Sequence, residues 1–347
     1  MVTLSLERQI EARRLPTWAP WATAGGALAV SVVVGLLGSG PSVAGVVVLA
    51  VVLYAVVLYA ASRAVEGPRR ATDRLASILV TSAFALAMIP LVSLVWIVVS
   101  RGVRLFGIAF LTTDMVGIFG DMTEGGAVHA IVGTLLVTGA AAVISIPIGL
   151  LTAIYLVEYG RGPLARAITF LVDVMTGIPS IVAGLFAFAL FTLILGPAYR
   201  AGIMGAVALA VLMTPVVVRS VEEMLRLVPN ELREASFALG VPKWLTIVKV
   251  VLRTAMAGIV TGIMLAIARV IGETAPLLIT VGQLNQMNWD LFDGRMMTLP
   301  VFAYRQYAQG GVGIDRAWAA ALTLILIVMA LNLVARLVSR YFAPKAR

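Results

Sequence analysis

The chain has 347 residues, of which 61% are hydrophobic and only 12% are charged, and its formal net charge is +9. Soluble domains are about 45–50% apolar and about 25% charged, so this composition excludes an ordinary soluble protein and predicts a membrane protein. The basic residues are spread between apolar runs rather than gathered in a patch, which argues against nucleic acid as a partner. The chain has no cysteine, which excludes disulfides and thiolate metal sites.

Eight apolar runs are long enough to cross about 30 Å of hydrocarbon, which takes roughly 20 helical residues. In chain order they lie near 18–38, 42–62, 76–100, 127–156, 167–196, 201–218, 254–282 and 317–339. We therefore predict an all-α polytopic integral membrane protein. The first run has no convincing cleavage site, so we interpret it as an anchored helix rather than a removed signal peptide.

The basic residues also predict the orientation, because Lys- and Arg-rich loops stay in the cytoplasm. With the N-terminus inside, the cytoplasmic segments are 1–17, 63–75, 157–166, 219–253 and 340–347. These segments carry eighteen Lys and Arg residues, against six in the opposite loops. We expect a multi-pass protein of the cell membrane with both termini in the cytoplasm, and we interpret the net positive charge as this orientation signal.

The polar segment RAVEGPRRATDR (63–74) divides the chain in two. Residues 1–75 are predicted to hold an N-terminal segment, a first helix pair and this linker. Residues 76–347 are predicted to form a transmembrane domain of six spans. The sequence suggests no function for this first pair.

The longest cytoplasmic loop, 219–253, contains a short helix with signals at both ends. Pro229 prevents an earlier helix from continuing, and Asn230 is suited to cap the amides that follow. Gly240 permits a C-terminal stop, and Pro242 prevents continuation. The remaining helix of about nine residues spans roughly 13 Å. Because so short a helix is marginal alone in water, we expect it to rest on another surface.

Two charged residues, Arg269 and Glu273, lie inside the apolar run 254–282. Along a continuous helix Arg269 is about 24 Å from Arg253, the nearest charged residue before it. A charge at that depth costs about 2.5–3.5 kcal/mol on insertion scales. The spacing of four residues puts both side chains on one face of such a helix. One interpretation is a self-neutralising pair that holds helices together.

The alternative interpretation is an anion pathway. Arg269 presents a guanidinium that matches an oxyanion through two parallel hydrogen bonds, while Glu273 orients it and moderates its hold. Gly272 lets backbone or substrate approach closely, and Thr274 adds a hydroxyl group. Pro276 leaves the carbonyl of Gly272 without its helical donor. We predict that Arg269, Gly272, Glu273 and Thr274 line the pathway.

The segment TGIPSIVAG (176–184) favours a kinked, closely packed helix beside this pathway, to which we assign Ser180. Small residues there serve ordinary helix packing equally well. Asp173, seven residues into its run, is expected to pair or snorkel near the inner interface. Prolines 90, 147 and 215 suggest further kinks.

Catalytic and metal-binding patterns are missing from the sequence. His129, the single histidine, is expected to be a satisfied interfacial side chain, and one histidine without cysteines does not make a typical zinc site. No G-x-x-x-x-G-K-[ST] phosphate loop occurs, so ATP would have to act through another chain. The polar and aromatic outer loop 283–315 is a candidate surface for a solute-binding protein.

The stretch EASFALG (234–240) resembles the EAA loop of ABC-importer permeases, with a serine in place of the second alanine. Val250 and Leu252 fall where that motif has Ile and Leu, but Arg253 stands where proline is usual. In that family the loop forms a coupling helix that docks on a separate ATPase subunit. The resemblance therefore implies that the following residues contact the ATPase: Glu234, Ala235, Ser236 and Gly240.

Three further stretches, 130–160, 170–188 and 267–280, resemble the PstA family of phosphate-importer permeases, with the best match between 127 and 282. The resemblance implies a type I six-helix permease core, here with two extra N-terminal helices. It also implies four kinds of partner: a second homologous permease, an ATPase dimer that holds ATP and magnesium, an extracytoplasmic phosphate-binding protein, and the lipid bilayer. No cofactor is expected in this chain.

Other functions stay open at this stage. A permease for a different oxyanion is the nearest alternative. An ion-coupled secondary anion carrier would work without an ATPase, and the EAA-like loop disfavours it. A membrane enzyme is disfavoured because the spans contain too few acids, histidines and nucleophiles for a catalytic set.

Overall fold

The computed structural model describes residues 15–37, 42–120 and 122–342. Every regular element in these ranges is a helix, as the apolar runs predict. The chain divides into two compact units, residues 1–96 and residues 97–347. Each unit is described by itself.

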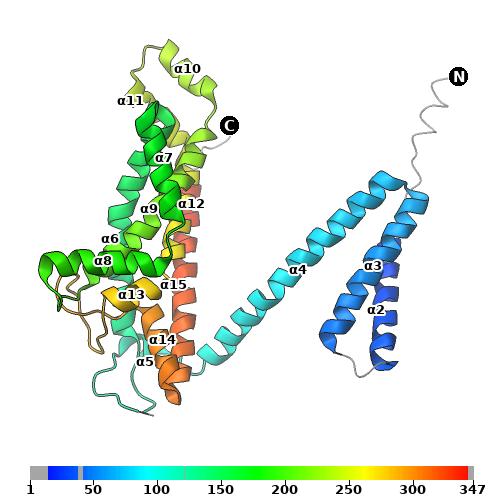
Figure 1. The fold of residues 1–347 in the computed structure, drawn as a ribbon, viewed down its shortest axis with the longest axis horizontal. Coiled ribbons are helices and arrows are strands. Elements are labelled where there is room, and N and C mark those ends of the chain that lie inside the picture. Colours follow the sequence, from blue (N-terminus) through cyan, green and yellow to red (C-terminus); the bar gives the residue numbers. More distant parts are fainter. Residues whose placement is uncertain (1–14, 38–41, 121, 343–347) are drawn as a thin grey trace. The chain divides into compact units, whose positions relative to one another are not determined.

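The first unit holds the helices α2 (Ala19–Leu37) and α3 (Val43–Val65), which pack together as a hairpin, and most of α4 (Pro68–Gly102) (Figure 1). Most of the predicted polar linker, residues 63–74, belongs to α3 and α4, so the linker is shorter than predicted. Only two residues separate α3 from α4, because Gly67 adopts φ +91° and Pro68 begins the next helix.

The buried carboxylate of Glu66 connects α3 to α4. The Glu66 side chain is 2% exposed and pairs with the Arg74 Nε at 2.7 Å. It also accepts hydrogen bonds from the Ser62 hydroxyl at 2.7 Å and from the Leu15 amide at 2.9 Å. Burial raises the pKa of Glu66, but the hydrogen bonds and the Arg74 charge outweigh it and lower that pKa to about 2.

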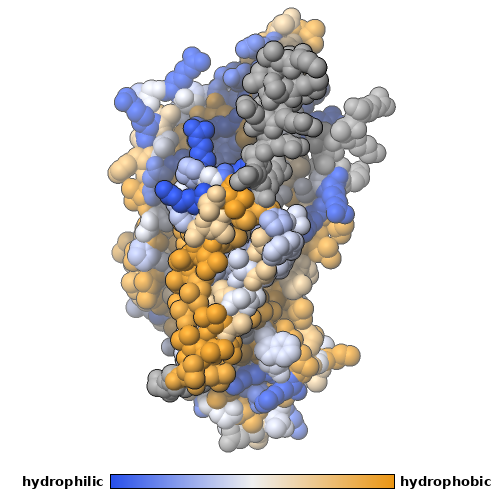
Figure 2. All heavy atoms as spheres, turned by 90° about the vertical axis from the view of Figure 1, so that its right-hand side faces the viewer, coloured by the Kyte–Doolittle hydropathy of each residue, from blue (hydrophilic) through white to orange (hydrophobic). Residues whose placement is uncertain are grey.

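Large apolar side chains on α2, α3 and α4 point outward, as in a helix that lipid surrounds. Trp21, Leu37 and Leu86 are among the most exposed of them. Figure 2 shows hydrophobic side chains over a large continuous part of the drawn surface. A soluble protein rarely exposes so much apolar surface.

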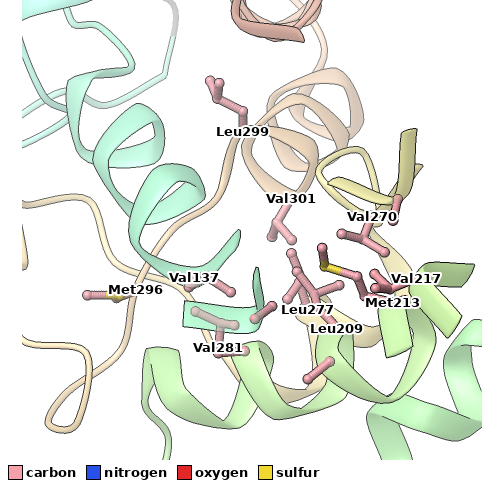
Figure 3. Close-up of a cluster of buried hydrophobic side chains, with 14 of the residues drawn as sticks. Val137, Leu209, Met213, Val217, Val270, Leu277, Val281, Met296, Leu299 and Val301 are labelled. Carbon is pink, nitrogen blue, oxygen red and sulfur yellow. The ribbon is translucent and has the colours of Figure 1, made fainter. Parts of the chain in front are cut away.

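The second unit is built around the pair α6 (Val128–Ile154) and α9 (Gly202–Arg226). Glycine permits their close approach, because a Cβ on Gly149 of α6 would lie 2.6 Å from the Val217 Cγ1 of α9. Helix α12 (Leu252–Val270) packs beside this pair, and α15 (Val312–Phe342) packs on α12 in turn. The side chains of Val137, Leu209 and Leu277 meet in the apolar cluster of Figure 3.

The predicted single span 167–196 is two helices, α7 (Pro163–Thr176) and α8 (Ser180–Leu195), bent by 108°. Pro179 causes the break, because it has no amide proton to donate and disfavours a helical conformation at Ile178. Seven helices in the described ranges are long and apolar enough to cross a membrane, and eight if this bent pair counts as one span.

The predicted span 254–282 is also broken. It is preceded by α11 (Lys243–Thr246) and a π-helical turn, η2 (Ile247–Val251). Helix α12 ends at Val270, and the six-residue α13 (Ala275–Thr280) follows. Pro276 lies in the first turn of α13, where a missing amide proton is tolerated, so the chain restarts there instead of continuing α12.

The two ends of the second unit carry different short elements (Figure 1). One end carries α10 (Asn230–Ala238), together with the end of α6, which continues as the π-helical turn η1 (Tyr155–Tyr159). The other end carries α5 (Ile108–Thr112) and α14 (Leu299–Gln309). The interpretation of 283–315 as a loop was therefore incomplete, because Pro300 in the first turn suits the start of α14.

The expected surroundings of His129 were wrong. Its side chain is buried in α6 and forms a T-shaped contact with the Phe302 ring at a centroid distance of 5.5 Å. Neither ring nitrogen has a hydrogen-bond partner among the described residues. The helices α4, α6 and α9 each continue through their internal proline, at positions 90, 147 and 215.

Candidate functional site

A cavity of about 210 Å³ lies where the two helix breaks meet. Thr176, Ile178 and Ser180 line it from the α7–α8 break, and Arg269 and Glu273 line it from the α12–α13 break. Helix α9 forms a further wall with Leu212, Pro215 and Val216. Irregular backbone at membrane depth is tolerated where it lines a cavity or is buried in protein, which matches this placement.

The structure brings three of the five predicted pathway residues into this cavity, namely Arg269, Glu273 and Ser180. Ser180 is placed there as the first residue of α8. Thr274 is the residue that precedes α13, and its carbonyl accepts a hydrogen bond from the Leu278 amide. Thr274 and Gly272 lie in the same break as Glu273, next to the lining residues.

The expected helical pairing of Arg269 with Glu273 was wrong. Because α12 ends at Val270, the four-residue spacing does not place the two side chains on one helix face. Among the described residues, neither side chain has an ion-pair or hydrogen-bond partner. The guanidinium and the carboxylate both border the cavity without neutralising each other through direct contact.

The dipoles at the end of α12 and at the start of α13 favour the two charges. Arg269 lies in the last turn of α12, where the helix dipole favours a cation. Glu273 lies two residues before the first residue of α13, at the end of that helix where the dipole favours an anion. Such dipole effects are worth about 0.3–1 kcal/mol each at exposed positions, less than the roughly 2.5–3.5 kcal/mol that a charge at membrane depth costs. Local helix electrostatics alone therefore does not account for the two residues.

The predicted close packing near the pathway is present between α8 and α13. A Cβ on Gly184 would lie 2.6 Å from the Cα of Pro276. This contact fixes the helical segment after one break against the segment after the other. By contrast, a Cβ on Gly272 would meet nothing within 4 Å, so this glycine borders open space.

The short helix α10 forms where the sequence predicts it, and Gly240 ends it with φ +75°. The predicted capping by Asn230 was wrong. Pro229 occupies the cap position, and Asn230 is the first helical residue, whose side chain accepts a hydrogen bond of 3.3 Å from Arg233. A proline that fixes φ near its helical value can start a helix without a side-chain cap.

The four residues of the EAA-like motif do not share one environment. Glu234 and Ala235 are exposed, beside the exposed apolar side chains of Phe237 and Leu239. Ser236 is buried, and its hydroxyl lies 2.8 Å from that of Thr246. The serine thus holds α10 against the following segment, while the surface available to another protein combines a carboxylate with apolar groups.

Arg233, which the sequence did not single out, anchors α10 to the rest of the unit. Its guanidinium donates hydrogen bonds of 2.8 and 3.1 Å to Glu158 in η1. It also donates to the carbonyls of Leu225 at 3.0 Å and Val228 at 2.6 Å, at the end of α9. The only signal in the sequence is a basic residue directly before the motif, and Glu158 lies 75 positions away.

Asp173 does form an ion pair. Its partner is Arg219 on α9, which also contacts Glu222 at 2.9 Å. Glu222 in turn pairs with Arg226 at 2.6 Å. From the sequence alone, Arg219 and Arg226 indicated only the orientation of the chain in the membrane. No group of three or more potential metal ligands occurs in the described ranges.

Comparison with known proteins identifies the family. Residues 145–347 match the family model described as "Binding-protein-dependent transport system inner membrane component". The "Phosphate transport system permease protein PstA 1" of Mycobacterium tuberculosis (strain CDC 1551 / Oshkosh) is 48% identical over 281 residues, which are 80% of this chain and 92% of that protein. The chain belongs to the PstA family of inner-membrane transport permeases. This PstA-family permease is thus a transport component, and the resemblance seen in its sequence is confirmed.

Two further relatives are similar over nearly their full lengths. The "Phosphate transport system permease protein PstA" of Mycobacterium leprae (strain TN) is 46% identical over 78% of this permease and 90% of its own length. The protein of that name from Yersinia pestis is 37% identical over 80% and 92%, respectively.

Solved structures show the same fold as this permease. An inward-facing structure of the MetNI methionine ABC transporter matches with a TM-score of 0.54 and 21% identity, over 62% of this permease and 96% of that chain. A bacterial alginate ABC transporter, in complex with an alginate pentasaccharide-bound periplasmic protein, matches with a TM-score of 0.54 and 15% identity, over 80% and 97%. The predicted ABC-importer permease fold is confirmed.

Proposed function

We propose that this PstA-family permease forms part of the membrane pathway of an ATP-driven phosphate importer. The cavity at the two helix breaks carries the proposal, because Arg269 borders it without a direct partner among the described residues. A guanidinium binds phosphate through parallel charge-assisted hydrogen bonds. The names of the three PstA relatives support phosphate as the substrate.

The arrangement of charges favours release of a bound anion over its tight retention. Arg269 attracts an oxyanion into the cavity, whereas the carboxylate of Glu273 on the same wall opposes tight retention. Ser180 and Thr176 add hydroxyl groups from the opposite break. Gly272 and Thr274 belong to this pathway in our proposal, since they form the backbone between the two charges.

The permease works with other subunits in this proposal. ATP and magnesium bind to a separate ATPase dimer, onto which α10 docks with Glu234, Ala235 and the exposed Phe237. Ser236 holds that helix against Thr246, and Gly240 ends it. A second homologous permease completes the pathway, and a phosphate-binding protein delivers the substrate from outside. The α10 end and both termini are cytoplasmic in this arrangement, as the distribution of basic residues favours.

Reconstitution tests the proposal. The permease is co-purified with its partner permease and ATPase, placed in liposomes with the phosphate-binding protein inside or outside, and assayed for uptake of labelled phosphate. We expect uptake only with ATP on the ATPase side and the binding protein on the opposite side. Uptake of sulfate in place of phosphate would assign another oxyanion. Phosphate uptake by the permease alone, driven by a proton or sodium gradient, would instead establish a secondary carrier.

A further inference from the structure

An ion cluster joins α7 and α9 next to the candidate cavity. Thr176 of α7 and Val216 of α9 line the cavity. Asp173 lies three residues before Thr176, and Arg219 lies three residues after Val216, which in both helices is about one turn. Helix α9 runs from this cavity towards α10, so the Arg219–Asp173 ion pair lies on the α10 side of the cavity.

A second cavity, of about 410 Å³, adjoins the same cluster. Asp173 and Glu222 line it together with Thr169, Arg166 and Arg226. The two carboxylates that hold Arg219 are therefore lining residues of the second cavity, while the Arg269 cavity begins one turn away. Along α9, Arg219 lies between Val216, which lines the Arg269 cavity, and Glu222, which lines the second cavity.

Two carboxylates in this cluster neutralise the charge of Arg219. Its guanidinium contacts Asp173 and Glu222, so an approaching anion meets a cation that two carboxylates already neutralise. Both members of the Arg219–Asp173 pair are partly exposed, at 34% and 59% of their side chains. Exposed ion pairs contribute little to stability, so a small shift between α7 and α9 can open this one.

We propose that the Arg219–Asp173 ion pair closes the pathway on its α10 side, and that Arg219 receives the oxyanion from the Arg269 cavity when the pair opens. This inference rests on the proposed transport function. Once Asp173 withdraws, the Arg219 guanidinium regains donors that match an oxyanion. Arg233 links α10 to the Leu225 and Val228 carbonyls beyond Arg219, so a displacement of α10 reaches the same segment of α9.

The test compares two single variants of the complete importer in phosphate-loaded liposomes. Asp173→Asn removes the closing contact and keeps Arg219. We expect passive phosphate efflux without ATP to rise at least threefold, with ATP-driven uptake retained within threefold. Arg219→Gln removes both the contact and the receiving cation, so we expect the same efflux but at least a tenfold loss of uptake. Glu223→Gln, an exposed glutamate of α9 that faces a different groove, is the matched control and should change neither rate.

The exchange Asp173→Arg with Arg219→Asp separates a gate from a folding defect. The swapped pair can re-form the contact, so efflux should return to the wild-type level. Efflux that stays at the wild-type level in Asp173→Asn would overturn the gate, and equal uptake by Asp173→Asn and Arg219→Gln would overturn the anion contact. If the wild-type complex takes up phosphate while either result appears, the proposed function stands and only this inference fails.

Discussion

Arg233 and Glu158 connect the short helix α10 to the end of α6 through two hydrogen bonds from one guanidinium. The contact is largely withdrawn from solvent, since the side chains are 13% and 7% exposed. The same arginine holds two carbonyls at the end of α9. Arg233 therefore connects α10 to both helices of the central pair.

Replacing Arg233 should disconnect α10 from this pair. Arg233→Gln leaves the buried Glu158 carboxylate without its cation, and breaking one partner of such a pair costs about 3–5 kcal/mol. We expect a lower unfolding temperature of the permease and a loss of phosphate uptake with ATP hydrolysis retained. In a double-mutant cycle, adding Glu158→Gln should restore part of the lost stability. Additive effects of the two substitutions would show that the contact couples nothing.

The exposed side of α10 should determine ATPase coupling. Glu234→Lys reverses a charge on this surface without affecting the interior contacts of Ser236 or Arg233. We expect the purified complex either to lose its ATPase subunits or to hydrolyse ATP without phosphate uptake. Glu223→Lys, which reverses an exposed charge on α9, is the control and should transport normally. Normal coupled uptake by Glu234→Lys would remove α10 from the docking surface.

The contact between the two helix breaks should be intolerant of a single methyl group. In Gly184→Ala the new Cβ would lie 2.6 Å from the Cα of Pro276, so α8 and α13 must separate. Overpacking of this kind costs about 1–3 kcal/mol, measurable as a lower unfolding temperature in detergent. Gly139→Ala is the matched control, because its Cβ would meet nothing within 4 Å inside α6. Equal unfolding temperatures of the two variants would contradict the close packing.

Acid should weaken the stabilisation that the Glu66 carboxylate provides between α3 and α4. Folding lowers the pKa of Glu66 from 4.5 to about 2, so the folded state favours the carboxylate. The resulting stabilisation is fully present above pH about 4.5 and is lost as the pH falls towards 2. In thermal unfolding of the full chain, the difference between wild type and Glu66→Gln should therefore shrink between pH 5 and pH 3. A constant difference would show that the Glu66 charge contributes nothing.

The sequence predicted most of the helices because long apolar runs and local stop signals carry that information. The ends of α10 follow from Pro229 and Gly240, and both are visible in the sequence. A kink at Pro179 was predicted and is present, but the full breaks at Pro179 and before Pro276 were not predicted, because hydropathy does not distinguish a continuous span from two half-helices. Both prolines were noticed, but whether a proline bends a helix or ends it depends on the surrounding packing.

Part of the candidate site was equally visible. Arg269 and Glu273 stand out as charges in an apolar run, and the structure places both at one cavity. Their expected contact failed only because α12 ends between them. The Arg233–Glu158 and Arg219–Asp173 pairs join positions 75 and 46 residues apart. Such long-range pairs follow from the packing of whole helices, and no local pattern in one sequence predicts them.

The most direct test of the pathway is ATP-driven phosphate uptake by the reconstituted importer with Arg269→Gln, beside Arg269→Lys as the charge-preserving control. A hydrogen bond to a charged group contributes about 1.5–3 kcal/mol, so losing it should slow uptake by roughly 10–150-fold. We predict that loss for Arg269→Gln, with unchanged assembly and partial activity in Arg269→Lys. Uptake by Arg269→Gln at the wild-type rate would show that phosphate does not pass this guanidinium.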